Sequence, residues 1–543
     1  MRERPIPLGY HPIVTLPHDL YAPRNTDPNT MCVLAIRSTR LRPTLTAPHR
    51  TAAALLLFAI AAGVRAQTMV PPDAVPAIAP AVRPGTVLNW NTGDGKSFAV
   101  PAFEISGYLT ALSILDRVTI PDEAAYRSTL HSTWEHLHEE HWVFDTDPFN
   151  MNQFSHPYGG SMTFGLARST GSSFWQALAY RNAASFVWEI AGETDLPSIN
   201  DQITTGTAGA LLGESLFRMA SLLLEGGGEH PGFWRELGAA IISPPTGFNR
   251  LMFGDRFKAV FPSHDPAIFT RLRWGVSTDL FKSNNLLLDQ RSAYTDRKQK
   301  EAILDFTFAY GLPGKTGYTY NRPFDYFSFE FAGQTSAHGH NFVQDVMVRG
   351  LLYGTDYQIG ENYRGIWGLY GNYDYIAPPI FRVSSTALSV GTTEQWWLSR
   401  HVAMQGSALL GVGFGAAGTI PRADNLRDYH YGVTPQGLLA LRFIFGHRTM
   451  LDFTARDYYV SGTGSDDRTG SEQIFRGDVG LTFRLFNHQA LGIEYVESHR
   501  HGHYGSLPDR YQSEGTFSLV YTLLGGSRFG AVDWRKNAEP ETE

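Results

Sequence analysis

Residues with acid, base or nucleophilic side chains gather between positions 145 and 214. They are His156, Ser161, Glu189, Glu193 and Asp201. A histidine near carboxylates and a hydroxyl has the parts needed for hydrolysis or acyl transfer, namely a base, a group that orients it and a nucleophile. Ser161 follows two glycines and is the candidate nucleophile, but the G-x-S-x-G turn of many hydrolases is absent. These five residues are therefore candidate catalytic residues.

A structural role is the competing interpretation for the same residues. Buried polar groups in proteins are hydrogen-bonded, so such a cluster could also satisfy backbone and side-chain groups where helices meet a polar barrel lumen. We favour this interpretation and expect no cofactor. The residues assigned to the structural network are Asn152, Gln153, Asn182, Ser198, Asn200 and Glu214.

Two histidine clusters raise the question of a metal site. His131, Glu135, His138 and His141 share a broad face of an expected helix and could bind a divalent ion. The run from His499 to His503 falls in an expected outer loop and could capture Zn²⁺ or Cu²⁺ weakly. Surface helices and loops often carry such residues without a ligand, so we expect no metal.

The segment 145–214 resembles a bacterial outer-membrane family described only as a domain of unknown function, with the pattern NQF-HPY-GS, WE, PS-ND and GE. The resemblance implies a place in the cell envelope and a barrel, and brings no established activity. The residues that match are Asn152, Gln153, His156, Pro157, Tyr158, Gly160, Ser161, Arg168, Trp188, Glu189, Glu193, Pro197, Ser198, Asn200, Asp201, Gly213 and Glu214, and the match extends to Pro245, Gly247, Asn249 and Arg250.

Helices are expected to position the candidate site. The spacing of apolar residues predicts a helix over 172–193, and Ser198 with Asp201 predicts the capped start of another. Gly206, Gly209 and Gly213 within this second helix predict a close approach to a neighbouring helix or to the barrel wall. The sequence Pro-Pro-Thr-Gly at 244–247 is interpreted as a connector outside any helix.

Beyond about residue 267 the helical period gives way to alternation of apolar and polar residues, which is typical of strands. One face is aromatic, and the other is rich in Ser, Gly, Asp, Glu and Arg, as in a transmembrane antiparallel barrel. A soluble barrel or sandwich is the alternative, but its exposed face should be rich in Lys and Glu. We expect about twelve strands, within a range of 10 to 14. The expected strands cover 268–278, 303–311, 323–333, 342–353, 363–375, 382–396, 402–415, 433–445, 448–460, 474–486, 489–498 and 514–525.

Connection lengths support a barrel, because outer-membrane barrels alternate short periplasmic turns with long outer loops. The later connections alternate in this way, with 499–513 as the last long loop, whereas 312–322 and 376–381 break the rule. The expected lumen carries charges that could form closing salt bridges or a conducting path. These charged residues are Asp305, Glu330, Asp345, Arg349 and Arg364.

The start of the chain resembles a secretion signal. The apolar run 52–64 follows several arginines, is too short to span a bilayer and ends in small residues, which predicts cleavage after Ala66. The upstream segment is unusually long, so either the signal is extended or translation starts later, for example at Met31. Cleavage would remove Cys32, the only cysteine. No other run offers about 18 uninterrupted apolar residues. Thr207 to Leu224 comes closest, but Glu214 and Arg218 interrupt it.

Composition narrows the classes further. The 543 residues include 45 Lys and Arg against 52 Asp and Glu, with 13% aromatic residues, which argues against a disordered chain and a nucleic-acid binder. The expected organisation is a signal and upstream extension over 1–66, a linker over 67–103, a helical domain over 104–250, a barrel over 264–526 and a tail over 527–543.

These observations predict a Gram-negative outer-membrane barrel protein with a helical domain that is periplasmic or plugs the lumen, in a structural or transport role. The expected partners are outer-membrane lipid, lipopolysaccharide and, during biogenesis, the barrel assembly machinery. The alternative is a membrane-embedded hydrolase or acyltransferase that acts on envelope lipid or lipopolysaccharide.

Overall fold

The computed structural model describes residues 87–119, 126–138, 141–283, 297–335, 342–378, 381–418, 429–462, 470–504, 507–526 and 528–534. The expected signal and the cleavage position after Ala66 lie outside the described residues.

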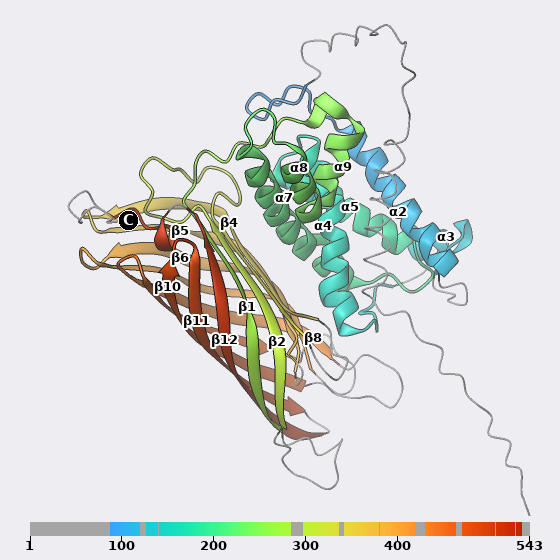
Figure 1. The fold of residues 1–543 in the computed structure, drawn as a ribbon. Helices are drawn as coiled ribbons and strands as arrows, with labels where there is room; N and C mark the ends of the chain where they lie inside the picture. Colours follow the sequence, from blue (N-terminus) through green and yellow to red (C-terminus); the bar gives the residue numbers. More distant parts are fainter. Residues whose placement is uncertain are drawn as a thin grey trace, which may run out of the picture. The chain divides into compact units, whose positions relative to one another are not determined.

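Twelve strands form one closed antiparallel barrel, in which each strand pairs with its neighbours in the chain and β1 pairs with β12 (Figure 1). The predicted strand number is confirmed. The strands are β1 (Ile268–Ser283), β2 (Arg297–Tyr310), β3 (Phe327–Gln334), β4 (Val343–Ile359), β5 (Tyr363–Ile376), β6 (Val383–Trp397), β7 (Val402–Ala417), β8 (His430–Phe445), β9 (Thr449–Val460), β10 (Gly470–Phe486), β11 (Gln489–Tyr504) and β12 (Leu507–Gly525).

Ion pairs between strands that are not neighbours identify the inner face of the barrel. Arg271 of β1 binds Asp452 of β9 at 2.7 Å, and Arg456 of β9 binds Glu330 of β3 at 2.7 Å. Such pairs can form only across the lumen. Because successive side chains of a strand point to opposite faces, the residues between them, such as Phe453, face outward.

The connection between β2 and β3 breaks the alternation as predicted, whereas one predicted loop is wrong. The segment between β2 and β3 is long although it lies at the same barrel end as the short turns after β4, β6, β8 and β10. The predicted loop 499–513 is wrong, because β11 and β12 continue through it and residues 505–506 alone separate them. Its histidines therefore lie on a strand.

The described part of the C-terminal tail, residues 528–534, packs into one end of the lumen. After β12 the chain forms a short turn, η6 (Phe529–Ala531), and Phe529 and Val532 pack against inward side chains at the end with the short turns. The Gly530 carbonyl accepts a hydrogen bond of 2.9 Å from inward-facing Gln405. The part of the tail that is described thus lies inside the barrel end.

The helical region precedes the barrel. Its elements are α2 (Ala99–Thr119), α3 (Leu130–His138), η3 (Met151–Ser155), α4 (His156–Ser169), α5 (Phe174–Ala191), α6 (Ile199–Asp201), η4 (Gln202–Ala208), α7 (Gly209–Glu225), α8 (Phe233–Ile242), α9 (Pro244–Met252) and η5 (Gly254–Phe257).

Local sequence signals explain several helix boundaries. Ser173 caps α5 in a reciprocal capping box with Gln176, and the Ser198 hydroxyl accepts from the Asp201 amide at 3.2 Å at the start of α6, as the sequence predicts. The predicted connector at Pro244 is wrong, because α9 begins there. Prolines are tolerated in a first helical turn, where the missing N–H has no partner within the helix.

Glycines bring α4 and α7 into contact. A Cβ built on Gly209 would lie 2.8 Å from the Cα of Gly160, and one on Gly213 would lie 2.8 Å from the Phe164 ring. The predicted close helix approach is therefore confirmed, with α4 as the neighbour.

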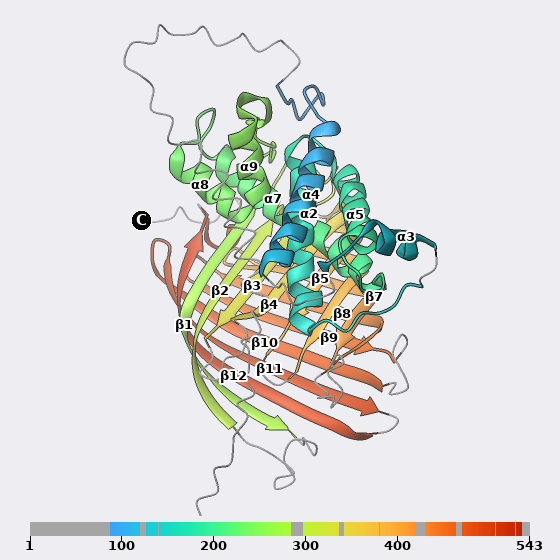
Figure 2. The same cartoon turned by 90° about the vertical axis from the view of Figure 1, so that its right-hand side faces the viewer.

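The helices pack against the outer face of the barrel wall. Phe164 of α4 and Leu211 of α7 share one buried cluster with Phe327, Val348 and Tyr373, which are outward-facing residues of β3, β4 and β5. Helix α7 contacts β4 and β5, and η4 contacts β6 (Figure 2). The interpretation of the helical domain as a lumen plug is thus wrong, because the side chains that it covers alternate with those that face the lumen.

Candidate functional site

Two aspartates flank His156, which begins α4. Its Nε2 atom lies 3.7 Å from an Asp147 carboxylate oxygen and 4.0 Å from an Asp201 carboxylate oxygen. Asp147 precedes η3, and the capped turn of α6 places Asp201. Asp147 and its neighbour Asp145 were not among the predicted site residues, although both stand in the Asp-Thr-Asp-Pro stretch directly before the matching pattern.

The two glutamates of the site come from the end of α5 and the segment after it. Glu189 accepts a hydrogen bond of 2.7 Å from the Ser198 amide, and Glu193 accepts one of 2.6 Å from the Trp188 indole. Glu193 lies in the connection between α5 and α6. Burial, reinforced by the nearby Glu189 carboxylate, raises the pKa of Glu193 to about 8.

These groups line a cavity of about 150 Å³ among α2, α4 and α5. Helix α2 contributes an apolar wall of Leu109, Leu112 and Leu115, whereas His156, Glu189, Glu193 and Asp147 contribute charged or polar groups. Arg181, a further lining residue, donates to the Thr205 carbonyl at 2.8 Å and to the Thr163 hydroxyl at 3.0 Å. The cavity is therefore amphiphilic.

Ser161 does not share this cavity. Its hydroxyl donates to the Tyr158 carbonyl at 2.6 Å, and the side chain is 2% exposed. A separation of five residues places His156 and Ser161 about 140° apart around a helix, so the two side chains point in different directions. The structure brings His156, Glu189, Glu193 and Asp201 together, and leaves Ser161 apart. Their catalytic roles remain predictions.

Two residues assigned to the structural network bond to the barrel wall, and the others contact neighbouring residues of the helical domain. Asn152 donates to the Tyr429 hydroxyl at 2.8 Å, and Gln153 donates to the Tyr431 hydroxyl at 3.1 Å. Asn200 donates to Asp145 at 3.1 Å. Asn182 lies beside Gly206, where an added Cβ would come 2.4 Å from its amide oxygen. These contacts lie outside the barrel, not at a polar lumen as expected.

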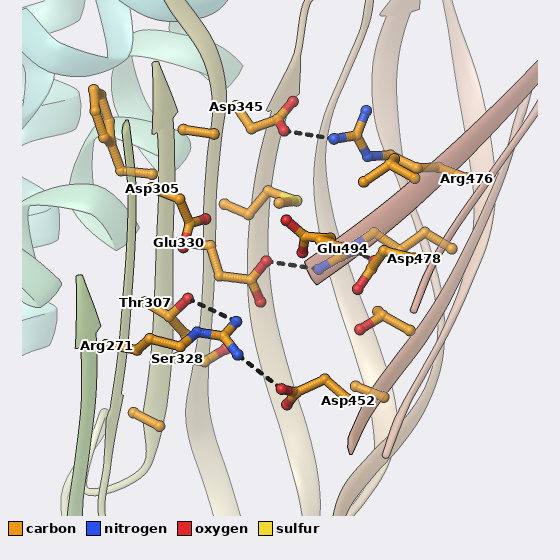
Figure 3. A pocket seen from close by; sticks show the side chains of 18 of the residues that line it. Arg271, Asp305, Thr307, Ser328, Glu330, Asp345, Asp452, Arg476, Asp478 and Glu494 are labelled. Atoms are coloured by element: carbon orange, nitrogen blue, oxygen red, sulfur yellow. Dashed lines mark hydrogen bonds and ion pairs between the residues drawn. The ribbon is translucent and has the colours of Figure 1, made fainter. Parts of the chain in front are cut away.

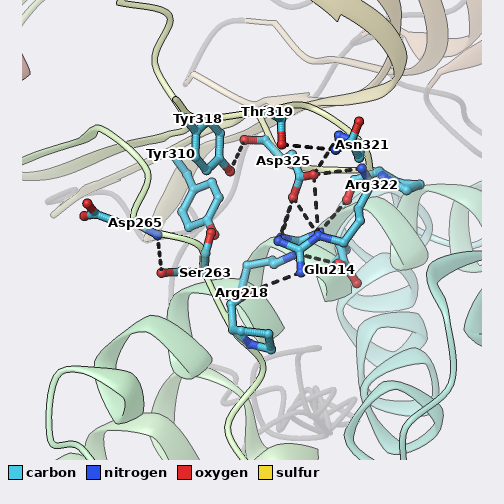
Figure 4. A network of polar contacts seen from close by, with 12 residues as sticks. Glu214, Arg218, Ser263, Asp265, Tyr310, Tyr318, Thr319, Asn321, Arg322 and Asp325 are labelled. Atoms are coloured by element: carbon cyan, nitrogen blue, oxygen red, sulfur yellow. Dashed lines mark hydrogen bonds and ion pairs between the residues drawn. The ribbon is translucent and has the colours of Figure 1, made fainter. Parts of the chain in front are cut away.

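Glu214 is fully buried, and it belongs to a network of polar contacts with Arg218 and Asp325 (Figure 4). It accepts from Arg168 Nε at 2.6 Å and from Arg218 Nε at 2.8 Å. Arg218 also reaches Asp325, in the connection between β2 and β3, at 3.2 Å. A chain of buried ion pairs thus joins α4, α7 and the barrel.

The histidine clusters make short-range contacts. His131 lies 3.2 Å from Glu135, and the His138 ring stacks on Trp134. In the other cluster His503 lies 2.8 Å from Asp509. Within the described ranges, no group of three His, Cys, Asp or Glu residues is arranged to hold a metal ion.

A second cavity, of about 220 Å³, lies in the lumen and is lined by charged residues of both signs (Figure 3). Asp305, Glu330, Asp345 and Arg349 line it, as predicted. Arg364 instead donates to the Gly314 carbonyl at 3.2 Å, within the long connection between β2 and β3. Arg476 spans the lumen to Asp345 at 2.7 Å.

Fold and site together define a class of protein, a closed twelve-stranded barrel whose outer wall carries a helical domain with an amphiphilic cavity. Residues 141–245 match the family model "Domain of unknown function (DUF3943)". No curated protein matches the chain.

Solved structures of outer-membrane channels resemble the chain weakly. The toluene transporter TodX of P. putida has 10% identity, covers 49% of this chain and 92% of its own, and has a TM-score of 0.21. The channel DcaP of Acinetobacter baumannii has 8% identity, covers 48% of this chain and 96% of its own, and has a TM-score of 0.22. An outer-membrane channel from Pseudomonas putida F1 has 10% identity, covers 48% of this chain and 96% of its own, and has a TM-score of 0.26. Likenesses at this level do not bear on the function of this chain.

Proposed function

We propose that the chain is an outer-membrane protein whose barrel spans the bilayer and holds the helical domain there. The observation that carries the proposal is the contrast between the two barrel faces. Away from the helices, strands β9 to β12 expose large apolar side chains outward, while charged pairs fill the lumen. An apolar band around a polar interior is the pattern of barrels in lipid. The outward residues include Phe453, Phe475, Val479, Leu481, Leu491, Ile493, Phe517 and Leu519.

The role that we propose for the barrel is structural. Ion pairs cross the lumen at three positions along β9 and β10, and the tail packs into the end with the short turns. Buried pairs in such a place are held by mutual attraction and by hydrogen bonds, so their separation is costly. A transport role would require these contacts to open.

Two measurements test this proposal. The folded protein should stay in the outer-membrane fraction and migrate differently on a gel before and after heating, and it should give no steady open-channel current in planar lipid bilayers. Recovery in the soluble periplasmic fraction would contradict the membrane location. A stable conductance of the unmodified chain would contradict the structural role and favour transport.

Biogenesis follows from this location. We infer that a signal cleaved near Ala66 directs the chain across the inner membrane, that the barrel assembly machinery inserts it, and that lipopolysaccharide and phospholipid then surround it. Mass spectrometry of the mature protein would give the cleavage position. A mature chain that retains the segment 52–64 would contradict cleavage there.

A second candidate function is an enzyme that acts on envelope lipid or lipopolysaccharide. The cavity favours it, because a histidine between two carboxylates can take and return a proton and an apolar wall suits an acyl chain. Since Ser161 lies outside the cavity, an activated water is the nucleophile that this geometry accommodates.

Incubation with vesicles of phospholipid and lipopolysaccharide, followed by mass spectrometry of the lipids, tests the enzyme. Activity should be lost in His156→Gln and Asp147→Asn and retained in Ser161→Ala and in the surface control Glu135→Gln. Loss in Ser161→Ala in a folded variant would restore the serine mechanism. Absence of any lipid product from the unmodified protein would count against an enzyme with these substrates.

A further inference from the structure

We propose that the helical domain lies in the same bilayer as the barrel, with the outward face of α5 in contact with lipid acyl chains. This inference rests on the proposed outer-membrane location of the barrel. It replaces the expected periplasmic position of the helices.

The first argument is that the helices cover part of the wall that lipid would otherwise cover. The outward residues Phe308 and Phe329 are 5% and 8% exposed where the helical domain packs, whereas Phe453 and Val479 on the free side are 39% and 45% exposed. A domain that seals the outer wall between the two barrel ends has to sit at the height of the bilayer.

The second argument is that the domain contacts both ends of the strands. Arg218 of α7 bonds to Asp325 in the connection at the end with the short turns. Asn152 and Gln153 of η3 bond to Tyr429 and Tyr431, at the opposite end, where β8 begins. The helical domain therefore contacts the barrel wall near both ends of the strands that it covers.

The third argument is the composition of the exposed face of α5. Every exposed position of this helix carries an apolar side chain, and two of the largest, Phe186 and Val187, are 46% and 52% exposed. A helix face in water is normally rich in charged and polar residues. The exposed residues of α5 are Trp175, Ala179, Ala183, Phe186, Val187 and Ala191.

Helix lengths agree with this position. Helix α5 has 18 residues and α2 has 21, which correspond to about 27 and 31 Å at 1.5 Å per residue. The hydrocarbon core of a bilayer is about 30 Å thick. Among the described residues, one helical segment, Ile199–Glu225, is by length and composition able to cross a membrane, and 78% of its apolar window is buried.

The charges that interrupt this segment in the sequence are neutralised in the fold. Glu214 lies between Arg168 and Arg218, and Arg218 also pairs with Asp325. Ionisable residues at membrane depth are tolerated when they face the protein interior and pair with one another. The interruption therefore does not exclude the segment from the bilayer.

Spin labels can distinguish lipid from water at chosen positions of the full chain. The Cys32→Ser substitution removes the only cysteine. Single cysteines are then placed at Ala183 and Val187 on α5, at Leu491 on the free barrel face, and at Ser399 in a short turn. In liposomes, the contacts of each label with molecular oxygen, which concentrates in lipid, and with a water-soluble nickel chelate are compared. Labelled variants are used only if they keep heat-modifiable migration.

We expect the labels at Ala183 and Val187 to behave like the label at Leu491, with high access to oxygen and low access to the nickel chelate. If they behave like the label at Ser399 while Leu491 remains in lipid, the inference fails and the membrane barrel stands. If Leu491 is also open to the chelate, the proposed membrane location itself fails. Labels on α5 that neither reagent reaches would show a protein-covered face and would overturn the inference.

Discussion

At the scale of single residues, Glu214 joins the buried arginines Arg168 of α4 and Arg218 of α7, and Arg218 continues the network to Asp325 of the barrel. We expect Glu214→Gln to destabilise the protein by about 3–5 kcal/mol, because the substitution leaves Arg168 and Arg218 buried with one carboxylate fewer. Thermal unfolding in detergent, followed by circular dichroism, measures the loss.

The control for Glu214 is a pair on the surface. Asp255 lies 3.3 Å from Lys258, and both side chains are mostly exposed. Asp255→Asn should change the stability by about 1 kcal/mol or less. Equal effects of the two substitutions would show that the buried network does not contribute more than an ordinary surface pair.

Glu193 gives a prediction about pH. Its raised pKa, about 8, means that the folded protein favours the neutral carboxyl, so this group opposes folding increasingly as the pH rises from 4.5 through about 8. Glu193→Gln keeps a neutral group of the same shape, and we expect its melting temperature to match that of the unmodified protein at pH 4.5 and to exceed it above pH 8. A constant difference at all pH values would contradict this assignment.

At the scale of elements, two adjacent glycines of α4 should respond in opposite ways to alanine. A Cβ at Gly160 would lie 2.2 Å from the Thr205 carbonyl oxygen, whereas nothing lies within 4 Å of a Cβ at Gly159. We expect Gly160→Ala to cost about 1–3 kcal/mol through overpacking and Gly159→Ala to gain up to about 1 kcal/mol in helix propensity. Thermal unfolding of both variants measures these effects, and a similar result for the two would contradict the close packing of α4 on η4 and the start of α7.

The elements also show where a single sequence is informative. The alternation of polar and apolar residues over the C-terminal half predicts the strands. Successive side chains of a strand face opposite sides, so inward positions meet a polar lumen and outward positions meet an apolar medium. The cap at Ser173 and the glycines of α7 are likewise local signals. The extension of β11 and β12 through 499–513 was missed because His, Arg and Gly at these positions are typical of loops. The strands continue there because their backbones pair across the hairpin.

The location of the helices could not be predicted for a different reason. Phe308 and Phe453 are both outward aromatic residues of strands, but one faces a helix and the other is exposed. Lipid and an apolar helix surface select the same side chains, so the pattern does not distinguish them. In the candidate site, Glu189 and Glu193 could be named as candidates from the sequence. The contribution of Asp147 and the separation of Ser161 depend on how the helices fold back on each other.

At the scale of the whole molecule, we expect two groups of contacts to block the lumen, namely the C-terminal tail and the ion pairs that cross it. Each group can be removed separately. Deleting residues 527–543 removes Phe529 and Val532 from the end with the short turns, but leaves the ion pairs of Arg271 and Arg456 across the lumen. We therefore expect the truncated protein to give no channel current in planar bilayers.

Combining the deletion with Arg271→Ala and Arg456→Ala should open a current that prefers cations. Glu330 and Asp478 would then stand in the lumen without Arg456, and Asp452 would keep only Arg442 as an ion-pair partner. The lumen would therefore gain negative charge, and carboxylates in a pore attract cations and repel anions. A current from the deletion alone would show that the tail is the only barrier. Silence of the combined variant, if it retains heat-modifiable migration, would show that the remaining inward side chains fill the lumen without help from these ion pairs.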